Sequence, residues 1–193
     1  MARPRKNAFD VDTETRVLEA AEERFGAAGF ARCRLEDIAA DAGIKRSSLL
    51  YHFGSKDALY AAVVRRAFAE IARALGDAMA APGDYRARLD GVVTGLLAFE
   101  AAHRPLTGVI LRELIDGSQV VGRELAPIVD ALEGFVTTHG ADCVPAGVPV
   151  RAAIMQLIVS HLACASAGEL GTTLWGPGEH TRALTRALLV RGS

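Results

Sequence analysis

A cluster of cationic and hydroxyl side chains stands at the start of a short apolar segment. Lys45, Arg46, Ser47 and Ser48 come directly before Leu49 and the aromatic residues that follow it. Lys and Arg bind phosphates and the edges of bases, and Ser hydroxyls form hydrogen bonds to both. Placed together at the beginning of one helix, these residues form a candidate surface for a nucleic acid.

The position of the cations along their helices supports an anionic partner. Lys45 opens a predicted helix over about residues 45–53, and Arg34 stands where a preceding helix, about 35–42, should have its cap. A cation at the positive end of a helix dipole costs a few tenths to about 1 kcal/mol. A phosphate at the same place attracts both the helix end and the side chain. The alternative is that both cations point into water.

The elements around this cluster have the pattern of a helix-turn-helix. Ile38 and Ala39 form the inner face of the first helix, Gly43 lies in the turn, and Ile44 and Leu49 anchor the second helix. In such a motif the second helix lays its N-terminal residues against base edges in the major groove. We therefore predict that residues 45–48 contact DNA.

Hydrophobic periodicity predicts helices along the whole chain. An all-α fold follows: an N-terminal three-helix helix-turn-helix domain, a long helix, and a larger C-terminal helical bundle, with about nine helices. The first helix should end at residues 26–29, and Ser55 should cap the long helix, which reaches Pro82. Later helices are expected over about 84–102, 105–114, 120–138 with a kink or restart at Pro127, 150–167 and 179–190, with loops over 140–149 and 171–178.

Composition and charge fit this arrangement. Half of the 193 residues are hydrophobic, and the formal net charge is −1. Residues 1–66 hold twelve Lys and Arg against ten Asp and Glu, while the remainder holds ten against thirteen. The three cysteines have no CxxC spacing, which suits a reducing compartment, and we expect a cytoplasmic protein. The N-terminus lacks the apolar run of a signal peptide, and the apolar run 152–167 is shorter than the roughly 20 residues of a membrane span.

Few residues favour catalysis. Glu100 and His103 share a helix face at a spacing that suits a metal, but no second pair completes a ligand set. The chain has no GxSxG, P-loop or GxGxxG motif. We predict that the protein is not an enzyme and that it needs no cofactor or metal.

The segment GFARCRLEDIAADAGIKRSSLLYHFGSKDALY resembles the DNA-binding domain of the TetR family of bacterial transcriptional regulators. The matching skeleton is Gly29-Phe30, Asp37-Ile38-Ala39, Ala42-Gly43-Ile44, Leu49, His52-Phe53, Ser55-Lys56 and Leu59. The resemblance implies that Tyr51 faces DNA together with residues 45–48 and that His52 and Lys56 touch phosphates. His52 has the alternative of a structural role inside the domain, and Phe53 and Leu59 are expected in the core. The chain departs from the family pattern at Leu50, where a phosphate-binding tyrosine is frequent, and at Arg34 and Lys45, where Ser or Thr caps are usual.

The resemblance also implies a domain organisation and partners. A basic arm covers residues 1–11, the helix-turn-helix domain 12–57, and a ligand-binding and dimerisation domain 58–193. The arm residues Arg3, Pro4, Arg5 and Lys6 are candidates for the minor groove, with a solubilising tail as the alternative. Helix 150–167 is apolar nearly all round, so it should be buried on several sides, with Leu184, Leu188 and Leu189 of the last helix completing a homodimer interface. Two such domains in a dimer would read a palindromic DNA operator.

A small-molecule pocket is the remaining expectation from the resemblance. Its candidates are apolar, aromatic or histidine residues of the larger domain: Phe99, His103, Ile110, Met155, Ile158, His161 and Trp175. The ligand should be apolar or amphipathic, with ordinary core packing as the alternative role of these residues. We therefore expect a ligand-released repressor. The rival functions are a constitutive or architectural DNA-binding protein and a helical enzyme or carrier with a vestigial DNA-binding domain.

Overall fold

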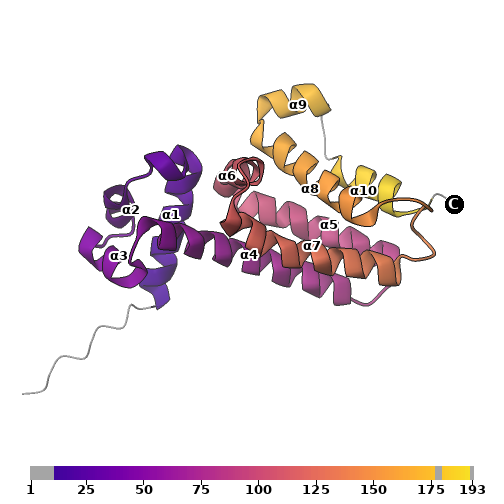
Figure 1. Ribbon diagram of the computed structural model, residues 1–193, viewed down its shortest axis with the longest axis horizontal. Helices are drawn as coiled ribbons and strands as arrows, with labels where there is room; N and C mark the ends of the chain where they lie inside the picture. Colours follow the sequence, from indigo (N-terminus) through magenta and orange to yellow (C-terminus); the bar gives the residue numbers. More distant parts are fainter. Residues whose placement is uncertain (1–10, 177–179, 192–193) are drawn as a thin grey trace, which may run out of the picture. The chain divides into compact units, whose positions relative to one another are not determined.

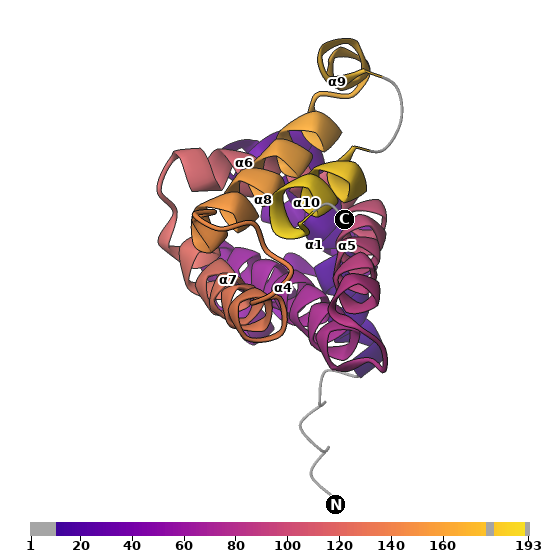
Figure 2. The ribbon, with the colours of Figure 1, turned by 90° about the vertical axis from the view of Figure 1, so that its right-hand side faces the viewer.

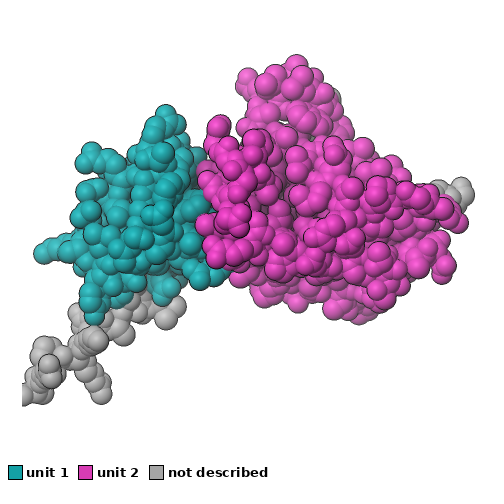
Figure 3. Space-filling model, in the orientation of Figure 1, with its two compact units in different colours: residues 1–65 teal, residues 66–193 magenta. Residues whose placement is uncertain are grey.

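The computed structural model describes residues 11–176 and 180–191, and every regular element in these ranges is a helix. The all-α prediction is confirmed, with ten helices described instead of about nine. They are α1 (Val11–Arg32), α2 (Leu35–Asp41), α3 (Arg46–Phe53), α4 (Lys56–Ala80), α5 (Tyr85–Ala102), α6 (Arg104–Ile115), α7 (Gln119–His139), α8 (Val150–Ser166), α9 (Glu169–Trp175) and α10 (Thr181–Leu189) (Figure 1). The chain divides into two compact units, unit 1 of residues 1–65 and unit 2 of residues 66–193 (Figure 3). Residues 1–10 of the predicted basic arm lie outside the described residues, and Val11 is the first residue of α1.

Unit 1 has a core built on one face of α1. Val17, Ala21 and Phe25 recur at four-residue spacing and are fully buried. The helix continues past Gly26, where the sequence predicted an end region, and breaks at Gly29, whose backbone has φ 74° and ψ 162°. That break returns the chain to the core, because the ring of Phe30 lies 5.9 Å from the ring of Phe25, between centroids.

The turn between α2 and α3 closes with a pair of backbone hydrogen bonds. The amide of Ile44 donates to the carbonyl of Ala39 at 2.9 Å, and the amide of Gly43 donates to that of Ala40 at 3.1 Å. This pairing is the Schellman arrangement, which requires a left-handed residue just beyond the helix end. Gly43 meets that requirement with φ +70°. Gly43 therefore forms the turn that the helix-turn-helix prediction assigned to it.

Helix α4 begins in unit 1 and ends in unit 2. Ser55 caps it as predicted, because its Oγ accepts a hydrogen bond from the amide of Ala58 at 3.1 Å. The boundary between the compact units falls between Arg65 and Arg66, inside the helix.

Unit 2 is a helical bundle around the apolar face of its part of α4 and the inner faces of α5, α7 and α8. The buried α4 residues are Ala67, Phe68, Ile71 and Leu75. Helix α8 packs against α6, α7, α9 and α10, and it lies side by side with α10 in Figure 2. Helix α7 continues through Pro127 without a restart, and buried residues on both sides of the proline, Leu125 and Ile128, hold it to the core. No helix in the described ranges has both the length and the apolar character to cross a membrane.

The segment over residues 171–178 was predicted as a loop, and that prediction is wrong for its first part, which belongs to α9. Gly168, Gly171, Thr172 and Thr173 disfavour a helix by propensity. Packing overrides propensity here, because Gly171 lies so close to α8 that a Cβ atom on it would clash with the carbonyl oxygen of Cys164. Only glycine permits this approach.

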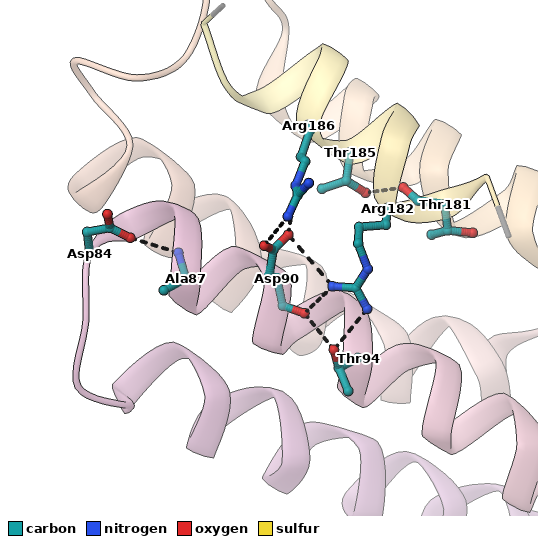
Figure 4. A network of polar contacts seen from close by, with 8 residues as sticks. All are labelled: Asp84, Ala87, Asp90, Thr94, Thr181, Arg182, Thr185 and Arg186. Atoms are coloured by element: carbon teal, nitrogen blue, oxygen red, sulfur yellow. Dashed lines mark hydrogen bonds and ion pairs between the residues drawn. The ribbon is translucent and has the colours of Figure 1, made fainter. Parts of the chain in front are cut away.

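Helix α10 is tied to α5 by a polar network (Figure 4). The guanidinium of Arg186 binds the carboxylate of Asp90 through Nη2 at 2.5 Å and Nε at 3.1 Å. Arg182 donates to the backbone carbonyl of Asp90 at 3.2 Å and to Oγ1 of Thr94 at 3.1 Å. The hydrogen bond from Arg186 lowers the pKa of the Asp90 carboxyl below its usual value. These contacts fix the last described helix against the bundle.

Candidate functional site

Helix α3 is held to unit 1 by a single buried side chain, Leu49. The residues before it are open to solvent: Lys45, Arg46 and Ser47 are exposed and Ser48 is half-buried. Tyr51, one turn after Ser47, is 69% exposed. The helix therefore presents its N-terminal residues and Tyr51 outward while Leu49 anchors it from behind. This is the disposition that insertion of a helix N-terminus into a DNA groove needs.

The two cations predicted at helix N-termini occupy those positions. Arg34 is the N-cap residue of α2 and Lys45 that of α3, and neither cap has a side-chain hydrogen bond to the helix. Both helices therefore begin without the Ser or Thr side chain that usually accepts a hydrogen bond from a first-turn amide. An anion bound there would meet both the amides and the cationic side chains of Lys45 and Arg46.

Acidic residues of α2 pair with arginines around this surface. Oε1 of Glu36 lies 2.9 Å from Nε of Arg46, and its Oε2 lies 3.9 Å from Nε of Arg34. Asp41 accepts a hydrogen bond from Nη2 of Arg24 at 2.8 Å, and this bond lowers the pKa of Asp41. Reasoning from the sequence missed Glu36, because its proximity to Arg46 depends on how α2 and α3 cross.

Lys56, a predicted phosphate-binding residue, contacts other residues of unit 1. Its Nζ donates to the carbonyl of Ala31 at 3.2 Å and lies 4.7 Å from the centroid of the Phe30 ring. His52 is exposed, and its ring contacts Tyr51 edge-on at 5.1 Å between centroids. Phe53, expected in the core, is only half-buried. Phosphate contacts of Lys56 and His52 stay predictions.

A narrow cavity of about 70 Å³ lies inside unit 2. Helix α4 lines it with Phe68, Ile71 and Leu75, three of the residues that it also buries in the bundle. Four of the seven predicted ligand residues are in its wall: Phe99, Ile110, Ile158 and His161. His103 and Met155 are not among its lining residues. The wall is almost entirely apolar, so the cavity suits an apolar group.

A wider cleft of about 560 Å³ lies between α5, α8, α9 and α10. Trp175 and His161, both predicted, line it, and each is held in place: Nε1 of Trp175 donates to Oγ of Ser160 at 3.3 Å, and Nδ1 of His161 lies 3.0 Å from Oγ1 of Thr181. Glu100 and His161 line both the cleft and the narrow cavity. The sequence analysis considered Glu100 only as a possible metal ligand and did not predict it in a pocket wall. Its position one turn after Leu96, on the inward face of α5, was the signal for that role.

His103 connects α4 with the junction of α5 and α6. The side chain is buried, its ring lies 4.6 Å from the ring of Phe99, and its Nε2 lies 3.4 Å from Oε2 of Glu70. It thus contacts a wall residue of the cavity without lining the cavity itself. In the described part of the chain, no group of three or more His, Cys, Asp or Glu side chains is placed to hold a metal ion.

Comparisons with known proteins agree with this geometry. Residues 17–63 match the family model described as "Bacterial regulatory proteins, tetR family". The HTH-type transcriptional regulator RutR of Escherichia coli (strain K12) is 50% identical over 50 residues, which are 26% of this chain and 24% of RutR. The matched segment therefore spans about a quarter of that relative.

Solved structures extend the likeness to the whole fold. FadR from Bacillus subtilis, solved in complex with stearoyl-CoA, superposes with a TM-score of 0.71 at 17% identity over 91% of this chain and 95% of that one. SmeT, the repressor of the multidrug efflux pump SmeDEF of Stenotrophomonas maltophilia, has a TM-score of 0.71 at 21% identity over 93% of each chain.

The exposed second helix of a helix-turn-helix, followed by a helical bundle, defines the class of helix-turn-helix regulators. Within that class, residues 17–63 match the DNA-binding domain of the TetR family of bacterial regulatory proteins. Of the relatives named above, RutR and FadR are transcriptional regulators and SmeT is a repressor.

Proposed function

We propose that the protein is a cytoplasmic, homodimeric, DNA-binding transcriptional repressor that a small apolar or amphipathic ligand releases from a palindromic operator. The observation that carries DNA binding is the outward display of residues 45–48 and Tyr51 on a helix anchored by Leu49. Its cations lie at the positive end of the helix dipole, where they are unfavourable in water and where a bound phosphate would stabilise them. The minor-groove role of the arm remains part of the proposal.

DNA binding is tested on the DNA that flanks the gene. Purified protein should protect a short palindrome against nuclease digestion in the presence of scrambled competitor DNA. Changing Arg46→Ala together with Ser48→Ala should reduce operator affinity by at least about tenfold, since base contacts are worth about 1–3 kcal/mol each. The control is Arg73→Ala with Ser118→Ala, which removes the same side-chain types from unit 2. Unchanged operator affinity in the α3 variant contradicts the assignment of these residues.

A homodimer is supported by apolar side chains that face outward on neighbouring helices. Leu184 of α10 is 42% exposed, and Val159 of α8 is also open to solvent. Burying such side chains against the same helices of a second copy would remove them from water. Val159→Asp with Leu184→Asp should therefore yield a monomer by light scattering. The control Ile115→Asp, at a residue 77% exposed on α6, should leave the dimer intact.

Ligand release is supported by the position of the narrow cavity. Because α4 supplies Phe68, Ile71 and Leu75 to its wall and also enters unit 1, a ligand that displaces these side chains acts on the helix that leads to the DNA-binding unit. Ligand binding then favours a conformation in which the two recognition helices of the dimer no longer fit successive major grooves.

The probes for this step are straight-chain fatty acids of 6 to 16 carbons, a class chosen for its amphipathic character. One of them should lower operator affinity in wild type and fail to do so in Ile158→Trp, which fills the cavity. The narrow cavity's volume of about 70 Å³ is far below the roughly 300 Å³ of ordinary ligand sites, so a constitutive DNA-binding regulator is the second candidate unless a ligand also occupies the wider cleft of about 560 Å³. Retained DNA affinity with every probe supports that candidate.

A further inference from the structure

Glu36 on α2 is the acidic side chain nearest to the guanidinium of Arg46. The closest approach joins Oε1 of Glu36 to Nε of Arg46 at 2.9 Å, and both side chains are about half exposed. The other oxygen of the same carboxylate lies 3.9 Å from Nε of Arg34. One carboxylate thus lies beside two of the cations on the proposed DNA-binding surface.

The pair explains how Arg46 is tolerated in the unbound protein. Arg46 is the first residue of α3, where the helix dipole repels a cation, and α3 has no acidic residue in its first turn. Glu36 provides the missing negative charge from the neighbouring helix. Because both partners are in contact with water, the pairing is weak and reversible.

We propose that Glu36 is a specificity-determining residue, which lowers the attraction of Arg46 and Arg34 for phosphates while leaving Arg46 able to read a base. This inference rests on the proposed DNA-binding function. The contact approaches Arg46 at Nε, so Nη1 and Nη2 remain at the far end of the guanidinium to donate to a base edge such as guanine O6 and N7.

The two modes of DNA binding respond differently to this carboxylate. Non-specific binding comes almost entirely from the attraction between cations and phosphates, so a fixed negative charge on the binding surface weakens it directly. Specific binding depends in addition on the direction of hydrogen bonds to bases, which the carboxylate leaves in place. Glu36 should therefore widen the gap between operator and random DNA.

The test measures the affinity of the full-length protein for its operator and for random DNA of equal length over a salt series. Glu36→Gln should bind random DNA roughly three- to fivefold more tightly, with less than about a twofold change for the operator. The slope of log affinity against log salt for random DNA should steepen by about 1, since one more cation reaches a phosphate. Glu23→Gln is the matched control, because it removes the same charge from an exposed site on α1.

A double-mutant cycle ties the effect to Arg46. In an Arg46→Gln background, Glu36→Gln should lose most of its effect on the ratio of operator to random affinity. Equal effects of Glu36→Gln and Glu23→Gln, or an unchanged ratio in Glu36→Gln, overturn the inference while leaving the DNA-binding proposal in place. A wild type that shows no preference for any flanking DNA at any salt concentration overturns both.

Discussion

Leu49 offers a sharp test of how the recognition helix is held, because its neighbour Leu50 provides a matched control. Leu49 has no exposed surface and is the only residue of α3 that is buried, whereas Leu50 is half-buried on the same helix. Leu→Ala removes three carbon atoms, worth about 2.4 kcal/mol at about 0.8 kcal/mol for each buried group. The cavity left behind adds to this, so we expect a loss of about 3–4 kcal/mol for Leu49→Ala.

That loss is large compared with the stability available to a unit of this size. At about 0.05–0.15 kcal/mol per residue, the 65 residues of unit 1 have about 3–10 kcal/mol. Leu49→Ala should therefore leave α3 substantially unfolded and abolish operator binding. Leu50→Ala should cost less than about 1.5 kcal/mol, because part of its side chain is already in water.

The assay is amide hydrogen exchange of the full-length protein, followed by mass spectrometry of peptides from α3 and α8. A loss of about 3 kcal/mol speeds opening about a hundredfold, so exchange of the α3 peptide should accelerate by that factor in Leu49→Ala and by less than about tenfold in Leu50→Ala. Exchange in α8 should stay constant. Equal acceleration in the two variants, or less than fivefold in Leu49→Ala, would refute the view that one side chain anchors the recognition helix.

Two further predictions concern unit 2. Asp90→Asn should lower the melting temperature by about 2 °C at pH 7, because it removes the charged partner of Arg186. Since the pKa of Asp90 is lowered in the folded state, this contribution is present above the ordinary carboxyl pKa of about 3.9 and is lost as pH falls through the folded value, so wild type and variant should converge in melting scans toward pH 3. Tyr85 donates to the carbonyl of Leu189 at 3.1 Å, and Tyr85→Phe should cost about 1 kcal/mol in urea denaturation. Burial raises the pKa of Tyr85 to about 12, so its stabilisation is complete below pH 10 and is lost between pH 10 and 12, and the ultraviolet titration step missing from Tyr85→Phe should fall near pH 12.

Local chemistry made unit 1 predictable from the sequence. Gly43 marked the turn, Ser55 marked the start of α4, and the spacing of Ile38 and Leu49 marked the inner faces, because each of these signals depends on near neighbours in the chain. Arg34 and Lys45 also lie at the N-termini of α2 and α3, as the sequence predicted, and neither caps its helix through its side chain.

Contacts between packed helices could not be predicted from the sequence. Helix α9 depends on the close approach of Gly171 to α8, and the residue types of 169–175 alone do not predict that approach. The pairing of Glu36 with Arg46 and the sharing of Glu100 between two cavities likewise depend on how helices cross. Periodicity gives the face on which a residue lies but not the residue it meets there.

The continuity of α4 through both units limits how this protein can recombine its units with those of other proteins. A chain cut at the boundary between the units would divide one helix, leaving the backbone carbonyls of residues 62–65 and the amides of residues 66–69 without their helical partners. Recombination that joins unit 1 to the helical bundle of another protein must therefore join the two parents within a helical register and not at a loop. A chimaera joined with an insertion of one residue in α4 would rotate everything beyond the junction by about 100°, since a turn holds 3.6 residues.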